Sequence, residues 1–147
     1  MQCELCDGDG GELLVSQEKY RVIAVGGTDG NTYPGFCRVI WNKHVREMTD
    51  LAQPDREQFM NAVYRVEAAL RLSLNPDKVN LASLGNMTPH LHWHIIPRFT
   101  NDASFPKPIW AATITPAITT NATAVATLEG AANWQDAIRA TFCDVGG

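Results

Sequence analysis

Residues 90–98 read His-Leu-His-Trp-His-Ile-Ile-Pro-Arg, so imidazoles alternate with apolar side chains over the first six positions. Successive side chains of a β-strand point to opposite faces of its sheet. We therefore expect His90, His92 and His94 to line one face at steps of ~6.6 Å, while the apolar residues between them enter the core. This stretch predicts a strand that carries a row of three imidazoles.

The segments before this strand predict a sheet covered by one long helix. Apolar residues recur at helical spacing from Pro54 to about Leu74, and Asn75-Pro76 ends the pattern. Runs of apolar and β-branched residues predict further strands, and Gly-rich or Pro-containing stretches predict turns between them. The strands are expected at 12–16, 22–25, 36–41 and 79–84, and the turns at 26–32 and 85–89. Strands on both sides of a single long helix indicate an α+β fold.

The last part of the chain gives weaker signals. Two prolines within 105–109 exclude a central strand, and residues 111–127 predict either a strand or a loop. Residues 131–142 have the pattern of a terminal helix. We predict one domain over 1–110 and a C-terminal extension, 111–147, that packs on the same domain.

Composition restricts the classes of partner. The chain has 147 residues and a formal net charge of -4, which suits one domain and provides no basic field for nucleic acid or an anionic membrane. No run approaches the ~20 apolar residues of a membrane span, and the first residues lack the pattern of a signal peptide. We expect a cytoplasmic protein without nucleic-acid or membrane partners, in which local groups contact any bound phosphate.

Three interpretations of the histidine row are open. The imidazoles can lie exposed on an edge strand without a role, or they can bind a catalytic zinc ion that keeps a position open for water. In the third interpretation, a neutral imidazole attacks phosphorus and carries the nucleotide transiently. That chemistry requires a carbonyl group to hold the proton on the other ring nitrogen, and a neighbouring histidine to protonate the leaving group.

The cysteines suggest a metal site near the start of the chain. Cys3 and Cys6 form a Cys-x-x-Cys pair, which in a reducing compartment indicates metal binding or redox chemistry. Two cysteines on a tight turn suit tetrahedral zinc, and His44, the one histidine outside the row, is the natural third ligand. Alternatively, the pair lies in a frayed terminus and His44 is a surface residue. Cys37 and Cys143 lie within apolar patterns and are expected in the core.

Residues 90–96 resemble the motif of the histidine-triad (HIT) superfamily. The resemblance extends to the cysteine pair, Pro34-Gly35 before an apolar strand, Lys43-His44-Val45 and the long helix, and it covers residues 3–98. The stretch 102–110 also resembles a bacterial branch of the superfamily, which includes dinucleoside polyphosphate hydrolases. The resemblance implies a HIT-like fold, with an antiparallel sheet, one long packed helix and a C-terminal helix.

The resemblance also implies roles for residues on the substrate side of the site. His92 corresponds to the nucleophile that forms the nucleotidyl intermediate, and His94 to the residue that contacts the phosphate and assists the leaving group. Asn86 lies where many relatives have a glutamine that binds phosphate or bridging oxygens. Ribose would contact Asp29, or alternatively Thr28, although both can equally be turn residues without a role.

Two further features follow from the resemblance. His90, the first residue of the catalytic triad, would be the fourth ligand of a closed structural zinc that also binds Cys3, Cys6 and His44. Met87 departs from the family pattern, because many relatives carry serine or threonine at this position, and proton delivery to the leaving group would therefore differ.

The function implied by the resemblance is cleavage of a phosphoanhydride or phosphoramidate at the α-phosphate of a purine nucleotide by a homodimer. The leading substrate is a dinucleoside polyphosphate such as diadenosine tetraphosphate. The alternatives are a nucleoside phosphoramidate hydrolase and a nucleotide-binding or signalling module with weak catalysis. Transfer to a sugar phosphate, as in galactose-1-phosphate uridylyltransferase, fits less well, because the chain is short and His94 stands where those transferases have glutamine.

Overall fold

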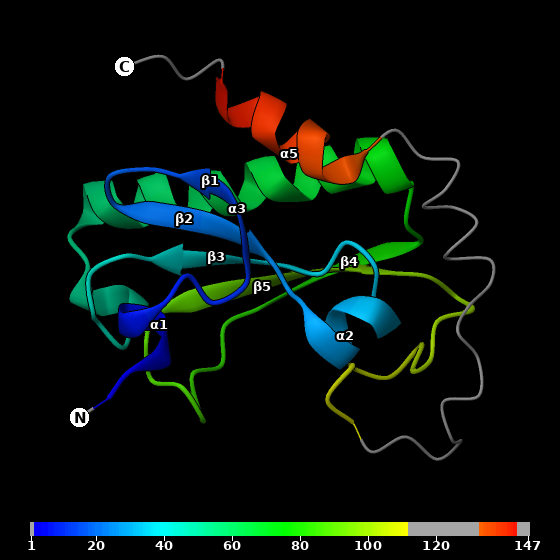
Figure 1. Cartoon of the computed structure of the whole chain (residues 1–147), viewed down its shortest axis with the longest axis horizontal. Helices are drawn as coiled ribbons and strands as arrows, with labels where there is room; N and C mark the ends of the chain where they lie inside the picture. The colour runs from blue at the N-terminus through cyan, green and yellow to red at the C-terminus, as the bar shows by residue number, and fades with distance from the viewer. Residues whose placement is uncertain (1, 112–132, 144–147) are drawn as a thin grey trace.

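Five antiparallel strands form one sheet in the order β1-β2-β3-β5-β4 (Figure 1). The computed structural model describes residues 2–111 and 133–143. The strands are β1 (Glu12–Ser16), β2 (Tyr20–Ala24), β3 (Cys37–Trp41), β4 (Lys78–Ala82) and β5 (His92–Arg98). The helices are α1 (Glu4–Asp7), α2 (Gly27–Thr32), α3 (Gln53–Leu74) and α5 (Trp134–Cys143), with a 3-10 turn η1 (Met48–Asp50). The predicted fold class, α+β with an antiparallel sheet, a long helix and a C-terminal helix, is confirmed.

Helix α3 covers one face of the sheet with the apolar stripe that its sequence predicts. Phe59, Val63, Val66 and Leu70 are all buried and belong to the same core cluster as residues of β2, β3 and β5. Pro54 lies in the first turn of the helix, and Asn75 ends it in the left-handed conformation (φ 47°).

Helix α5 extends this layer. Its buried residues Ile138 and Phe142 belong to the core cluster of α3, and Figure 1 shows α5 alongside α3. The terminal helix expected at 131–142 is therefore present from Trp134, while the domain boundary at residue 110 stays a prediction. The strand or loop expected at 111–127 lies almost entirely outside the described residues.

Gly35 brings the start of β3 close to the end of α3. It has a φ of +84°, and a Cβ atom at this position would lie 2.6 Å from Cδ1 of Leu74 and 2.9 Å from Cγ of Pro97. A side chain would therefore be both strained and sterically blocked. The glycine allows helix and sheet to meet where the Pro34-Gly35 motif enters β3.

Several local predictions were wrong. Residues 27–32 form the short helix α2 instead of a turn, and α1 was not expected. Strand β5 begins at His92 rather than His90, because the neighbouring Leu91 bonds to Val45 and Trp41 outside the regular ladder. Cys37 is buried as expected, whereas Cys143 is exposed at the end of α5.

Within the described part of the chain, none of the helices combines the length and hydropathy needed to cross a bilayer.

Candidate active site and metal centre

Strand β5 presents His92 and His94 on the face of the sheet opposite α3. The two residues pair with Ile40 and Arg38 of β3, and their rings lie 4.8 Å apart between centroids. Trp93 and Ile95, between and beyond them, pack toward the core cluster under α3. The alternation expected from the sequence therefore holds along β5. Both imidazoles are largely buried, with 6% and 5% of their surfaces exposed.

The ring of His92 has the orientation that attack on phosphorus requires. Its Nδ1–H donates to the main-chain carbonyl of His90 at 2.5 Å, so the lone pair is on Nε2. Burial, with a smaller effect of the Arg38 charge, lowers the pKa of His92 below its usual range. The imidazole is therefore neutral near pH 7, in the tautomer that leaves Nε2 able to act as a nucleophile.

His94 is held in the complementary tautomer. Its Nδ1 accepts a hydrogen bond from Nε of Arg38 at 3.3 Å, so its proton is on Nε2. Burial and the neighbouring charges of His92 and Arg38 lower the pKa of His94 to about 3. His94 thus contributes a neutral N–H donor. Two aromatic side chains, Phe36 and Trp110, flank its ring at 5.7 Å and 5.0 Å between centroids, and sequence reasoning did not assign Phe36 to the site.

The candidate substrate contacts lie on two separate segments, helix α2 and the loop before β5. Thr28 and Asp29 are exposed on α2. Burial lowers the pKa of Arg38, and the nearby carboxylate of Asp29 opposes this effect in part. Asn86 and Met87 are exposed in the loop before β5, with 97% of Met87 accessible. The structure therefore places α2 at the end of the site that holds Arg38 and His94. Among the described residues, Asn86 makes no hydrogen bond to the triad.

A cavity of about 320 Å³ adjoins the first two histidines. Its lining includes His90 and His92, residues of η1 and the loop at Ser83–Gly85. The hydroxyl of Ser83 donates to the carbonyl of His92 at 2.8 Å, a contact that sequence reasoning missed. This bond fixes the loop to the strand that carries the nucleophile candidate.

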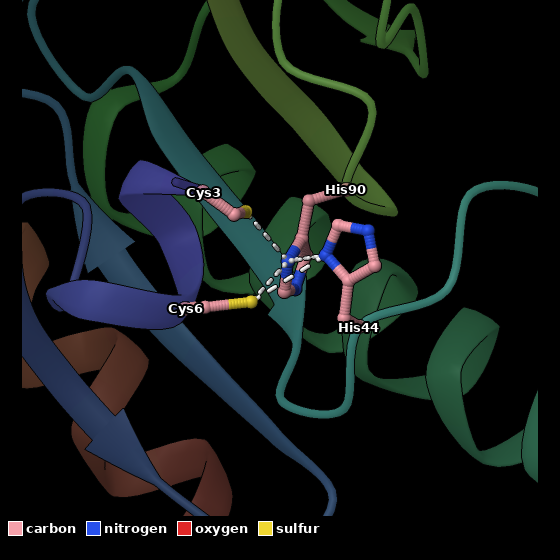
Figure 2. A group of neighbouring side chains, drawn as sticks. All are labelled: Cys3, Cys6, His44 and His90. Carbon is pink, nitrogen blue, oxygen red and sulfur yellow. Dashed lines mark hydrogen bonds between the residues drawn. The ribbon is translucent and has the colours of Figure 1, made fainter. Parts of the chain in front are cut away.

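Four side chains expected to bind a metal meet at one point. Cys3 immediately precedes helix α1 and Cys6 lies within it, while His44 follows β3 and His90 precedes β5. All four ligand atoms lie within 4.8 Å of one another. Figure 2 shows the two sulfurs and the two rings facing a common centre. The sequence separations of up to 87 residues make this a tertiary arrangement.

The spacing of these atoms fits tetrahedral coordination. Nδ1 of His90 lies 3.3 Å from Sγ of Cys3, 3.5 Å from Sγ of Cys6 and 3.2 Å from Nδ1 of His44. Zinc bonds of ordinary length at tetrahedral angles would place sulfur and nitrogen about 3.6 Å apart and two nitrogens about 3.3 Å apart. The Nε2–H of His90 donates to the carbonyl of Trp41 at 2.6 Å, which directs the lone pair of Nδ1 at the centre. The group has the chemistry and the size to hold a metal ion.

Arg21 fastens the cysteine segment to the sheet. It lies buried in β2, and its guanidinium donates to the carbonyls of Leu5, Gly8 and Asp9 at 2.6–3.0 Å. A fourth bond reaches Oδ1 of Asn42 at 3.0 Å. Helix α1 is thus held at its C-terminal end by one buried cation. Sequence reasoning missed this role, although an arginine within the apolar run 20–25 was a visible signal.

A second buried arginine organises the segment after β5. Arg98 forms two hydrogen bonds with the carboxylate of Asp102, at 2.7 and 3.0 Å, and both side chains are 3% exposed or less. Asp102 also accepts from three main-chain N–H groups, and Arg98 donates to Asn80 and to the carbonyl of Lys107. This pair closes the loop that brings Trp110 to His94.

Comparison with known proteins places the chain in a family. A family model for the HIT domain matches residues 14–101. Because this match covers more than half of the chain, the protein belongs to the HIT domain family, and the resemblance seen in the sequence is confirmed. No curated protein matches the chain.

Solved structures with the same fold come from several microorganisms. A histidine triad protein from Bradyrhizobium japonicum is 29% identical, with a TM-score of 0.68 and with 90% of this chain and 91% of that chain covered. One from Marinobacter aquaeolei is 20% identical, with a TM-score of 0.71 and coverage of 99% and 98%. A hypothetical histidine triad nucleotide-binding protein from Sulfolobus tokodaii is 19% identical, with a TM-score of 0.56 and coverage of 92% and 85%.

Proposed function

We propose that this protein is a nucleotide hydrolase that acts at the α-phosphate of a purine nucleotide through a covalent intermediate on His92. The leading substrates are dinucleoside polyphosphates such as diadenosine tetraphosphate, hydrolysed by a cytoplasmic homodimer. The observation that carries the proposal is the hydrogen bond from Nδ1–H of His92 to the carbonyl of His90, which leaves Nε2 as a free nucleophile. Membership of the HIT family supports it, as does the description of the Sulfolobus protein as nucleotide-binding.

The reaction has two displacements at phosphorus. Nε2 of His92 attacks the α-phosphorus, an N–P bond forms, and the bond to the leaving group breaks with its electron pair on the departing atom. Water then attacks the same phosphorus, the N–P bond breaks, and its electron pair returns to Nε2. The water proton passes to solvent and a nucleoside monophosphate is released. Throughout, the proton stays on Nδ1 of His92, which donates it in a hydrogen bond to the carbonyl of His90.

His94, helix α2 and the loop before β5 supply the remaining contacts in this proposal. The neutral Nε2–H of His94 donates to an oxygen of the transferring phosphate, where a preorganised donor stabilises the developing charge. Asn86 reaches the phosphate from the loop before β5. Asp29, or alternatively Thr28, contacts the ribose from α2.

The metal group has a structural role in the proposal. Cys3, Cys6, His44 and His90 would hold one zinc ion with all four positions taken by protein, so that the ion supplies structural cross-linking and no open site for water. The same His90 positions the nucleophile through its carbonyl. The group therefore stabilises the first residue of the triad.

Trapping the intermediate tests the proposal. The purified protein is mixed with α-labelled dinucleoside polyphosphate, quenched in alkali within one turnover, and digested to locate the label. We expect labelled His92 in the wild type, none in His92→Asn, and undiminished labelling in the control Tyr64→Phe, which alters an exposed residue of α3. A folded wild type that neither forms the adduct nor releases monophosphate from a panel of purine nucleotides would make the protein a binding module instead of an enzyme.

A further inference from the structure

Arg38 lies in the candidate site, beside the histidine that donates to the phosphate in the proposed mechanism. It lies on β3 directly opposite His94 of β5, on the face that carries the histidines. Its side chain is half-buried, and its guanidinium lies 5.7 Å from the centre of the Phe36 ring. The sequence shows an arginine at the second position of an apolar strand, Cys-Arg-Val-Ile-Trp, where an apolar residue would suit a purely structural role.

Only one nitrogen of this guanidinium has a partner in the described part of the chain. Nε donates to Nδ1 of His94, while the two terminal nitrogens donate to none of the described residues. No described carboxylate oxygen lies within the 4.0 Å of an ion pair, although Asp29 and Glu4 act on Arg38 from farther away. A half-buried cation with its terminal N–H groups free is suited to bind an anion, and a guanidinium binds phosphate oxygens in a bidentate manner.

The same hydrogen bond restricts the chemistry of the leaving group. Because Nδ1 of His94 accepts from Arg38, the proton of this ring is on Nε2 and the ring is a neutral donor. A neutral imidazole donates a hydrogen bond but is a poor acid. An amine leaving group must gain a proton as its bond to phosphorus breaks. A phosphate leaving group departs as an anion, since its last pKa is about 6.

We propose, on the basis of the function proposed above, that Arg38 makes this site selective for phosphoanhydrides over phosphoramidates by binding the departing phosphate. As Nε2 of His92 bonds to the α-phosphorus, the α–β bridging bond breaks and its electron pair stays on the β-phosphate oxygen. The terminal nitrogens of Arg38 donate to this phosphate, while Nε keeps His94 oriented. The substrate class is therefore a nucleoside 5′-polyphosphate or dinucleoside polyphosphate with an anionic leaving group.

Two substrates with the same nucleotide and different leaving groups test the assignment. Values of kcat/KM are measured for diadenosine tetraphosphate and for adenosine 5′-phosphoramidate, in the wild type, Arg38→Met and Arg38→Lys. We expect the wild type to prefer the anhydride at least tenfold. Arg38→Met should lose about 100-fold on the anhydride, the usual effect of removing one transition-state donor, and less than tenfold on the phosphoramidate. Arg38→Lys should recover part of the anhydride activity, because it restores the charge.

Controls separate this proposal from the one on which it rests. Arg71→Met removes an exposed arginine from the last turn of α3 and should leave both rates unchanged. Circular dichroism establishes folding, with Arg38→Gln as a second neutral variant if Arg38→Met does not fold. Equal losses on the two substrates, or a wild-type preference for the phosphoramidate, would overturn the assignment of Arg38 while the covalent mechanism stands. Absence of a His92 adduct with either substrate would refute the proposed function itself.

Discussion

Replacing Asp102 by asparagine removes the negative charge of the buried ion pair between Arg98 and Asp102. The carboxylate accepts two hydrogen bonds from Arg98 and three from the main-chain N–H groups of Phe99, Ser104 and Phe105. Removing one partner of a buried ion pair costs about 3–5 kcal/mol. Asn80 and Lys107 still accept from Arg98, so we expect the lower end of this range. A loss of about 3 kcal/mol corresponds to a fall in Tm of roughly 9 °C, at ~3 °C per kcal/mol.

The pH dependence of this loss has a definite sign. Burial alone would raise the pKa of Asp102, but the hydrogen bonds from Arg98 and from the main chain outweigh it and lower the pKa. A carboxyl whose pKa is depressed in the folded state stabilises the fold above its unfolded pKa of about 3.9, and this contribution is lost as the pH falls through the folded value. The difference between wild type and Asp102→Asn should therefore be constant near neutrality and shrink below about pH 4.

Urea unfolding followed by circular dichroism at pH 7 and pH 3 measures both effects. The control is Asp55→Asn, whose carboxylate accepts from the exposed Lys19 and whose replacement should change stability much less. The reasoning is refuted if Asp102→Asn loses less than ~1 kcal/mol at pH 7, where a buried pair should cost far more. A difference that widens in acid would refute it as well.

Three further perturbations test the metal group and the core. The proposed zinc site predicts one ion per wild-type chain, and Cys6→Ser should reduce this content and lower the Tm, as measured by elemental analysis and thermal unfolding; full zinc occupancy in the variant would contradict the ligand set. Arg21→Met should weaken zinc binding at least tenfold in competition with a chromophoric chelator, because α1 and the two residues that follow it lose three hydrogen bonds to their carbonyls; unchanged affinity would show that the cysteine pair needs no such support. Leu70→Ala should lower the free energy of unfolding by about 2–5 kcal/mol in urea, because Leu70 is fully buried. Leu72 is 89% exposed, so Leu72→Ala should change this free energy by no more than about 0.5 kcal/mol. Similar values for the two variants would contradict the buried stripe assigned to α3.

Periodic patterns predicted the main elements of the fold. In α3 and β5 the apolar residues recur with the period of the element, because one side of each element is buried. A single sequence is enough to show such a pattern. The short helices gave no such signal. Helix α2 has the sequence Gly-Thr-Asp-Gly-Asn-Thr, whose residues favour turns, and α1 has only four residues. Such segments become helical through contacts with the rest of the fold, which no local pattern contains.

The candidate site likewise contains residues that the sequence predicted and residues that it did not. The histidine spacing and the cysteine pair predicted the histidine row and three ligands of the metal group, because their chemistry is visible in the residue types. The fourth ligand, His90, came from the resemblance to the HIT family. The arginines behind the site were not predicted. A charged side chain is expected at the surface, and the burial of Arg21 and Arg98 depends on carbonyls and a carboxylate that only the tertiary fold brings together.

His90 has no polar group left uncommitted. Its N–H donates to the carbonyl of Thr88, its Nε2–H to that of Trp41, its Nδ1 faces the cysteines, and its carbonyl accepts from His92. A substitution that keeps the backbone of residue 90 in place would preserve the bond from its carbonyl to His92 and lose the contacts of the ring. Such a variant would weaken metal binding while keeping the orientation of the proposed nucleophile. A homologue that lacks the cysteines must restrain residue 90 by some other contact, and sequence changes in the two parts of the site should therefore occur together.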